Sequence, residues 1–469
     1  MQAFVNFFYL AAAVLFILGI KGMTKPKTAV RGNQLSALGM GLAVLAALLD
    51  FHVVSYGTII MGILVGGGVG VYMARKVQMT SVPEMVALLN GLGGGASLLV
   101  AAANYLESQQ LSSLGQFDPT VEWSVAVILS ILVGAVTLTG SLVAVGKLMG
   151  KVDDPKDIRH YKLGVKVSFA LLFVGTLTLV LGDTLNSGLL LTLMILLCLV
   201  LGVCLVMPIG GADMPVVVSL LNSYSGIAGA AAGFVLGNNG LIITGSLVGA
   251  SGLILTSIMC KAMNRSLVNV LFGGSMAASA GVSKSENDAF YEGKVKFASA
   301  EEVAMMLETA KRVVFVPGYG LAVAQAQHAT RELASLLESA GAKVKYAIHP
   351  VAGRMPGHMN VLLAEAEVPY DQLVEMDTIN PEFPQTDVAI VLGANDVVNP
   401  VAAKDKNSPI YGMPILEVYN ARTVIVVKRG LSPGFAGIPN ELFIRENTLM
   451  VPGDAKKVLQ DVIKALREG

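Results

Sequence analysis

Long apolar runs fill the first 272 positions of the chain, and the remainder has the mixed apolar and charged pattern of an α/β domain. A helix needs about 20 mainly apolar residues to cross the hydrocarbon layer of a membrane. Nine stretches approach or exceed this length, although the second is short and the eighth is polar in its middle. We predict spans at 3–20, 34–49, 54–74, 84–104, 122–146, 163–182, 187–207, 214–236 and 239–261.

Lysine and arginine alternate along this membrane half in a way that predicts its orientation. Up to residue 272, each basic residue follows an odd-numbered span or opens the next, and the loops after even-numbered spans carry none. Short loops rich in Lys and Arg stay in the cytoplasm. We therefore expect a multi-pass protein of the inner (cytoplasmic) membrane, with its N-terminus outside and its C-terminal domain in the cytosol.

The composition agrees with an integral membrane protein that carries a soluble domain. Apolar residues make up 54% of the 469 positions and charged residues 14%, against about 25% charged in soluble proteins. The formal net charge is zero, which gives no support to nucleic-acid binding. Cys198, Cys204 and Cys260 all lie in apolar stretches without the spacing of metal ligands, so we expect no metal site.

Three polar residues of the membrane half are candidates for proton coupling, because polar groups are costly in lipid and tend to mark ion paths. They are Asp213, Asn222 and Asn90. Asp213 precedes Met214-Pro215 and could instead cap the helix that begins there. The two asparagines could simply join neighbouring helices. No histidine lies inside a predicted span.

The soluble half begins with a polar stretch that is typical of a linker and continues as a nucleotide-binding pattern. We predict a transmembrane domain over 1–272, a linker over 273–299 and a nucleotide-binding domain over 300–469. A strand at Arg312 to Pro317 leads into Gly318-Tyr319-Gly320-Leu321-Ala322-Val323 and a helix to about Ala340. Glycines in such a turn let the backbone approach a pyrophosphate at the helix N-terminus. The fold class is therefore an α-helical bundle followed by a Rossmann-like, doubly wound parallel sheet.

Residues at the ends of the later strands favour NADP over NAD. The strand at Lys343 to Ile348 ends at His349, where an NAD-binding fold would usually present an acid to the ribose. Further strands are predicted at Val388 to Leu392 and Thr423 to Val427, and the latter runs into Lys428-Arg429. Two cations at the carboxyl end of a parallel strand suit a phosphate. A solvated basic pair is the alternative.

Five motifs together resemble the β subunit of proton-translocating NAD(P) transhydrogenase, and the resemblance covers nearly the whole chain. They begin at Met207 (Met-Pro-Ile-Gly-Gly-Ala-Asp-Met-Pro), Gly318 (Gly-Tyr-Gly-Leu-Ala-Val-Ala-Gln), His349 (His-Pro-Val-Ala-Gly-Arg-Met-Pro-Gly-His-Met-Asn), Gly393 (Gly-Ala-Asn-Asp-Val-Val-Asn-Pro) and Gly434 (Gly-Phe-Ala-Gly). The resemblance implies that NADP(H) binds to this chain and NAD(H) to a separate α subunit. Hydride would pass directly from NADH to NADP⁺, coupled to inward proton translocation, in a dimer of αβ units within the bilayer.

The resemblance also implies roles for particular residues. Gly318, Tyr319, Gly320 and Val323 would hold the pyrophosphate, and Lys428 with Arg429 the 2′-phosphate. Other implied NADP contacts are Arg354, Gly393, Ala394, Asn395 and Asp396, together with Gly434, Phe435 and Gly437 of a lid over the cofactor. Asp396 would also sense protonation, and Asp213, Asn222 and Asn90 would take part in proton coupling. No catalytic acid or base is implied, since the cofactors carry the hydride chemistry.

Three positions depart from the pattern of many relatives. Gly430 stands where Ser is common, Phe435 where Tyr is common, and Asn90 where some members have His. The last departure leaves the identity of the membrane proton carrier open; the chain is similar in this respect to forms with three chains, in which the histidine would come from a small α-type membrane subunit. A channel or transporter regulated by a cytosolic NADP-binding domain is the alternative function, and a membrane scaffold with a degenerate nucleotide fold is a third. A potassium filter is missing from the membrane half, because Gly318-Tyr319-Gly320 lies in the soluble half.

Overall fold

The computed structural model describes residues 2–50, 56–116, 120–155, 157–181, 187–272 and 289–468. Contacts divide the chain into two compact units, Met1–Pro208 with Val217–Thr256 and Ile209–Val216 with Ser257–Gly469. Long helices occupy all nine predicted spans. They are α1 (Gln2–Met23), α2 (Pro26–Asp50), α3 (Tyr56–Lys76), α4 (Val82–Ser113), α5 (Val121–Leu148), α6 (Arg159–Leu181), α7 (Ser187–Val206), α8 (Met214–Leu236) and α9 (Asn239–Ala262).

Eight of these helices are long and apolar enough to cross a membrane, as judged over the described residues. Helix α6 is not among them: its basic residues Arg159, Lys162 and Lys166 lie in its first turns, and the side chains of its apolar end, 177–181, lie outside the described residues. The prediction of a multi-pass membrane bundle is confirmed, while the count of nine spans stays a prediction. The structure also lengthens the second predicted span, since α2 begins at Pro26 and its exposed leucines and valines continue to Leu49.

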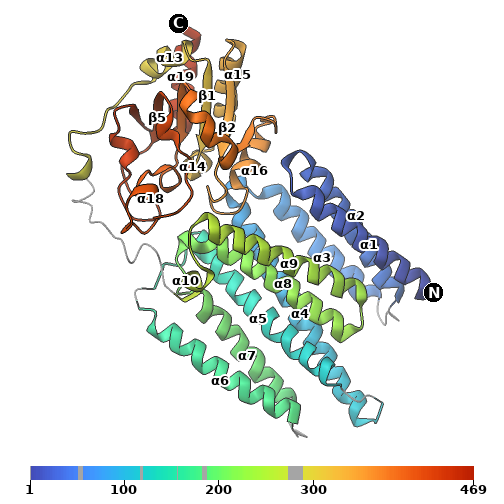
Figure 1. The fold of residues 1–469 in the computed structure, drawn as a ribbon. Helices are drawn as coiled ribbons and strands as arrows, with labels where there is room; N and C mark the ends of the chain where they lie inside the picture. The colour runs from blue at the N-terminus through green and yellow to red at the C-terminus, as the bar shows by residue number, and fades with distance from the viewer. Residues whose placement is uncertain are drawn as a thin grey trace. The chain divides into compact units, whose positions relative to one another are not determined.

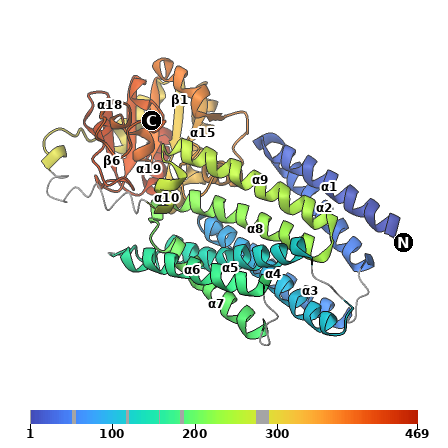
Figure 2. The same ribbon diagram turned by 60° about the horizontal axis from the view of Figure 1, so that its bottom comes forward.

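Small residues let helices α4 and α5 pack with their backbones close together, and the two lie side by side (Figure 2). A Cβ atom at Gly94 of α4 would lie 2.7 Å from the Cβ of Thr137 and 2.8 Å from the carbonyl oxygen of Gly134. A Cβ at Gly134 would in turn lie 2.6 Å from the carbonyl oxygen of Gly94. Glycines at such crossings permit close helix packing in lipid. This explains part of the glycine content of the membrane half.

The second unit contains a six-stranded parallel sheet with the order β3-β2-β1-β4-β5-β6. This is the doubly wound order, in which the direction of strand progression reverses between β1 and β4. Strands β1, β2 and β5 of this sheet are labelled in Figure 1. The four predicted strands are confirmed, and two were missed, the short β3 and β6. Their bounds are β1 (Arg312–Pro317), β2 (Lys343–Ile348), β3 (Leu373–Glu375), β4 (Val388–Leu392), β5 (Thr423–Lys428) and β6 (Thr448–Pro452).

Both faces of the sheet are covered. Helices α13 (Ala300–Glu308) and α15 (Gln327–Ser339) both pack against α19 (Ala455–Glu468), and α15 and α19 contact strands β2 and β5, respectively. The alternate residues of the strands belong to a hydrophobic core cluster. In this cluster Val314 and Val391 pack with the buried rings of Phe383 and Phe443. Because side chains alternate along a strand, the continuous apolar runs of β1, β4 and β5 fit a sheet that is buried on both sides.

Part of the predicted linker packs on this sheet domain. Tyr291 is 3% exposed, and its hydroxyl accepts a 2.6 Å hydrogen bond from the backbone N–H of Asn440. Phe297 pairs with Met450 beside β6. The remainder of the predicted linker, 273–288, lies outside the described residues. Residues 289–299 of the predicted linker therefore form part of the sheet domain.

The helix predicted after the glycine turn is interrupted. Helix α14 covers only Tyr319–Val323, and α15 begins at Gln327. Between them Gln325 has a φ of 51°, in the left-handed region that side-chain-bearing residues rarely adopt. A continuous helix to about Ala340 was therefore wrong, because the backbone turns at Gln325 before α15 packs along the sheet.

Candidate functional site

Two glycine-containing loops meet at the point where the strand order reverses. The backbone N–H of Gly320, after β1, donates a 2.9 Å hydrogen bond to the carbonyl of Gly393, after β4. A Cβ atom at Gly318 would lie 2.5 Å from the Cα of Ala394, and one at Gly320 would lie 2.6 Å from the Cα of Gly393. Glycine is therefore needed here for contact between the loops. Ligands of doubly wound sheets bind in this crevice.

A cavity of about 720 Å³ opens at this crevice, within the range of small-molecule sites. It brings together residues that follow β1, β2, β4, β5 and β6. Eleven of the residues predicted to contact NADP line it, namely Gly318, Tyr319, Gly320, Gly393, Ala394, Asn395, Asp396, Lys428, Arg429, Gly434 and Phe435. Segments that are more than 100 residues apart in sequence thus converge on one cavity.

Three predicted contact residues do not line the cavity. Val323 is 41% exposed in the last turn of α14, and Gly437 lies at the end of the lid segment, which we define as residues 430–437. Arg354 stacks its guanidinium on the ring of Tyr319, 4.5 Å from the ring centre. Arg354 thus reaches the site through its contact with Tyr319. The roles of Val323, Gly437 and Arg354 in NADP binding stay predictions.

Sequence reasoning missed two segments of the cavity wall. Val351–Gly353 follows β2, and Gly453–Ala455 follows β6 at the start of α19. The Pro452-Gly453-Asp454 turn signal was visible in the sequence, but the short strand before it was not recognised. Asp454 lines the cavity, and its Oδ1 accepts hydrogen bonds from the backbone N–H groups of Lys456 and Lys457.

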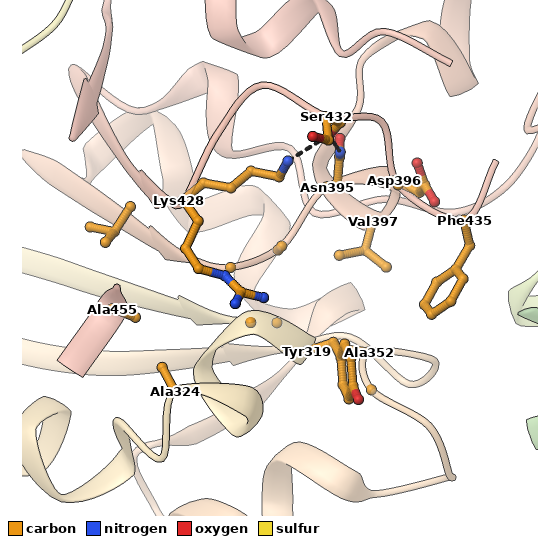
Figure 3. Close-up of a pocket in the computed structure, with 18 of the residues that line it drawn as sticks. Tyr319, Ala324, Ala352, Asn395, Asp396, Val397, Lys428, Ser432, Phe435 and Ala455 are labelled. Carbon is orange, nitrogen blue, oxygen red and sulfur yellow. Dashed lines mark hydrogen bonds between the residues drawn. The ribbon is translucent and has the colours of Figure 1, made fainter. Parts of the chain in front are cut away.

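Two aromatic rings lie at the cavity wall, Tyr319 from α14 and Phe435 from the lid segment. Their centres are 6.5 Å apart with the planes tilted by 43°. Phe435 is 48% exposed, a large exposed area for an aromatic side chain, and Figure 3 shows it at one end of the cavity near Asp396. Rings in this arrangement can cover a planar, partly apolar group.

Asp396 joins the loop after β4 to the lid segment. Its Oδ2 accepts a 3.0 Å hydrogen bond from the backbone N–H of Ala436. A Cβ at Gly434 would lie 2.5 Å from Asp396 Oδ1, so only glycine allows the lid to rest on this carboxylate. Burial raises the pKa of Asp396, while the amides of Ala436 and Phe435 and the Lys428 ammonium lower it in part. A raised carboxyl pKa is what the predicted protonation sensor requires.

The basic pair at the end of β5 lies at the cavity. Burial lowers the pKa of Lys428, and the nearby Asp396 carboxylate offsets this in part. Arg429 is exposed and also lines the cavity. Two adjacent cations at the end of a parallel strand suit a phosphate, although Asp396 and Asp454 also line the cavity.

His349 stands at the end of β2, where an acid is usual in NAD-binding folds, but it does not line the cavity. It is 2% exposed, with Nε2 2.9 Å from the carbonyl oxygen of Pro414 and Nδ1 accepting a hydrogen bond from the N–H of Val351. These partners require a neutral ring with its proton on Nε2. Burial lowers the pKa of His349 to about 4, so the ring stays neutral while it holds the loop that begins at Val351.

This buried imidazole should make the loop after β2 sensitive to acid. Between the ordinary His pKa of about 6.5 and the folded value of about 4, the unfolded state binds more protons, so stability falls as the pH is lowered through this window. The full shift corresponds to about 3 kcal/mol. We expect hydrogen exchange to show that the Val351–Arg354 amides open more easily at pH 5 than at pH 7. His349→Gln should flatten this dependence, and the exposed His328→Gln should not.

The polar residues of the membrane half fall into two groups. Asn90 of α4 accepts a 2.6 Å hydrogen bond from the hydroxyl of Ser225 in α8, and its amide lies 3.5 Å from the hydroxyl of Ser141 in α5. Asn222 is half-buried on α8. Asn90 therefore does join helices, which was one of the two predicted roles. A role for either asparagine in proton coupling stays a prediction.

Asp213 is fully buried and forms an ion pair that the sequence did not indicate. Its Oδ2 lies 3.3 Å from Nη1 of Arg265, whose side chain is 12% exposed. Asp213 ends a short 3₁₀ helix, Gly211–Asp213, directly before α8. Arg265 follows α9, after the last predicted span. A buried carboxylate with a buried cation partner has an electrostatic role beyond that of a capping residue.

The fold and cavity define a class of protein, a multi-pass membrane protein with a doubly wound sheet domain that has a cavity at its switch point. A profile of the NAD(P) transhydrogenase beta subunit family matches residues 5–465, and the chain belongs to this family. It is 48% identical over 462 residues to the NAD(P) transhydrogenase subunit beta of Rhodospirillum rubrum, with 98% of each chain covered. The same values hold for the protein of that name from the ATCC 11170 strain.

These comparisons confirm the resemblance inferred from the motifs, and with it the function of a transhydrogenase β subunit. They favour this enzyme over a regulated channel, transporter or scaffold. The chain matches essentially the full length of its relatives. Both the membrane helices and the sheet domain are therefore part of the family's common architecture.

Proposed function

We propose that the cavity binds NADP(H) and that this chain exchanges hydride with an NAD(H) molecule held by another subunit. The observation that carries the proposal is the convergence of the glycine loops, the aromatic rings and Lys428-Arg429 on one cavity at the switch point of the sheet. The glycine turn before α14 suits the pyrophosphate, and the basic pair suits the 2′-phosphate. The relatives' name, NAD(P) transhydrogenase subunit beta, supports the same ligand.

The nicotinamide ring supplies the hydride chemistry when the cofactor is bound, and the protein supplies binding and geometry. Gly318 and Gly320 bring the backbone close to the ligand, and Tyr319 with Phe435 covers an apolar end of the cavity. The lid segment excludes water, which would protect the hydride donor and hold the reacting rings in position. No side chain needs to act as an acid or base.

The membrane half supplies the coupling to protons in this proposal. Asp213, Asn222 and Asn90 take part in proton movement through the helices, and Asp396 responds to protonation beside the nucleotide. The support is the complete burial of Asp213 beside Arg265, the contact of Asn90 with two serines, and the raised pKa of Asp396. Asn90 cannot itself change charge, so the titrating group that works beside it comes from a partner chain.

We also propose the orientation and the partner. The alternation of basic residues supports a cytosolic sheet domain, where nicotinamide nucleotides are available, and in this proposal protons move inward as NADP⁺ is reduced. A subunit named beta implies an alpha subunit, which would bring the NAD(H) site. The assembled enzyme is a dimer of αβ units in the inner membrane.

A vesicle experiment tests this function. The chain is reconstituted with its α partner, and reduction of an NAD⁺ analogue by NADPH is followed by absorbance while a pH-sensitive dye reports the vesicle interior. We expect turnover with proton movement for the complete enzyme, and neither for vesicles with this chain alone. Proton flux that is controlled by NADP⁺ without hydride transfer would contradict the proposal and favour a regulated channel.

A further inference from the structure

The two adjacent cations at the end of β5 have different surroundings. Lys428 Nζ donates hydrogen bonds to two backbone carbonyls of the lid segment, at 2.9 Å to Gly430 and 2.5 Å to Ser432. Figure 3 shows the side chain reaching toward Ser432. Within the described part of the chain, no hydrogen bond or ion pair holds the Arg429 guanidinium, which lines the same cavity.

The carbonyls that Lys428 contacts belong to the start of the lid segment, where no strand or helix holds the backbone. The side-chain amide of Asn395 donates a 3.2 Å hydrogen bond to the same Ser432 oxygen. At the other end of the lid segment, the Asp396 carboxylate accepts from Ala436. The lid is thus fastened at both ends by side chains from the ends of β4 and β5.

The two hydrogen bonds of Lys428 should stabilise the lid segment in its observed position. A hydrogen bond from a charged donor is stronger than one between neutral groups, and the Lys428 ammonium makes two of them, a half-buried one to Gly430 and an exposed one to Ser432. The ammonium has three donors, and two are already directed at the lid. Arg429 keeps the planar donor set that suits a phosphate.

We propose that Lys428 is a positioning residue that fastens the lid segment over the cavity, and that Arg429 is the member of the pair that receives the 2′-phosphate. This inference rests on the proposed NADP(H) site and divides its basic pair into two roles. Lys428 then governs how long any nucleotide stays bound, while Arg429 governs which nucleotide is preferred.

The test compares Lys428→Met with Arg429→Met in the full-length chain in detergent. Stopped-flow fluorescence gives the release rates of NADPH and NADH, and calorimetry gives the affinities for NADP⁺ and NAD⁺. We expect Lys428→Met to speed the release of both reduced nucleotides by about tenfold or more, from the loss of one or two charged hydrogen bonds, with little change in the NADP⁺ to NAD⁺ affinity ratio. Lys456→Met, an exposed lysine on α19, is the matched control.

A second arm needs no nucleotide and keeps the inference separate from the proposed function. Hydrogen exchange of the ligand-free chain should show faster exchange at Leu431–Phe435 in Lys428→Met than in the parent or in Lys456→Met. Lys428→Gln, which can still donate to one carbonyl, should give an intermediate rate and serves if the methionine variant fails to fold.

Unchanged lid exchange, or a loss of NADP⁺ preference in Lys428→Met as large as that in Arg429→Met, would overturn the division of roles. Faster lid exchange in a chain that binds no NADP⁺ would instead support the lysine contacts and contradict the ligand assignment.

Discussion

Replacing Asp213 with Asn should abolish proton-coupled transhydrogenation. The substitution keeps the size of the side chain and its ability to cap a helix, but it removes the charge that faces Arg265 at 3.3 Å. Breaking a buried ion pair by removing one partner costs about 3–5 kcal/mol, because the remaining charge is left uncompensated. We expect coupled turnover, measured in vesicles with the α partner, to fall to background while NADP⁺ affinity stays near that of the parent chain.

A double variant separates a structural role from a role in coupling. Asp213→Asn with Arg265→Gln removes both charges, so folded yield and thermal stability should recover relative to the single variant. Coupled turnover should not recover if the carboxyl group takes part in proton movement. Asp154→Asn is the matched control, since it also removes the acidic partner of a basic residue, Lys147, but at a half-exposed carboxylate. Normal coupled turnover in either Asp213 variant would show that Asp213 has only a structural role.

Replacing Arg429 with Met should remove most of the preference for the phosphorylated nucleotide. Its guanidinium lines the cavity at the end of β5, free for a bidentate contact with a phosphate. Charged hydrogen bonds of this kind are worth about 1.5–3 kcal/mol, which corresponds to roughly a 10- to 100-fold weaker affinity for NADP⁺. The affinity for NAD⁺, which has no 2′-phosphate, should change by no more than about twofold on the same scale.

Isothermal titration of the full-length chain in detergent measures both affinities. Arg445→Met is the matched control, because Arg445 stacks on Tyr419 at 4.5 Å and does not line the cavity. Equal losses of affinity for NADP⁺ and NAD⁺ in Arg429→Met would show that the guanidinium does not bind the 2′-phosphate.

Much of the fold could be predicted because its signals are local in sequence. A run of apolar residues long enough to span a membrane needs no partner to be recognised, and helices lie at all nine predicted spans. Buried parallel strands are continuous apolar runs, so β1, β2, β4 and β5 were placed within a residue or so. The three-residue β3 lacked such length and was missed, and β6 before Gly453 was missed although it is as long as β4.

The site was predicted as a set of residues but not as an arrangement. Glycine turns after β1 and β4 and the cations after β5 could be aligned because parallel strands end at one edge of the sheet. The contact between Gly318 and Ala394, and the two carbonyls that hold Lys428, depend on loops brought together only by folding.

Two further features could not be predicted, because they too depend on contacts that form only on folding. The left-handed backbone at Gln325 interrupts a sequence with good helix formers on both sides, because packing on the sheet overrides local preference. The pairing of Asp213 with Arg265 joins positions 52 residues apart that neither periodicity nor motif spacing connects. The burial of the carboxylate and the identity of its cation partner therefore had to come from the structure.

The account depends most on the claim that the cavity at the switch point prefers the 2′-phosphorylated nucleotide. The most direct measurement is calorimetric titration of the unaltered chain with NADP⁺ and with NAD⁺ under identical buffer and detergent conditions. We predict that NADP⁺ binds at least about 100-fold more tightly, as expected for a phosphate held by charged hydrogen bonds. Equal affinities for the two nucleotides, or no binding of either, would contradict it.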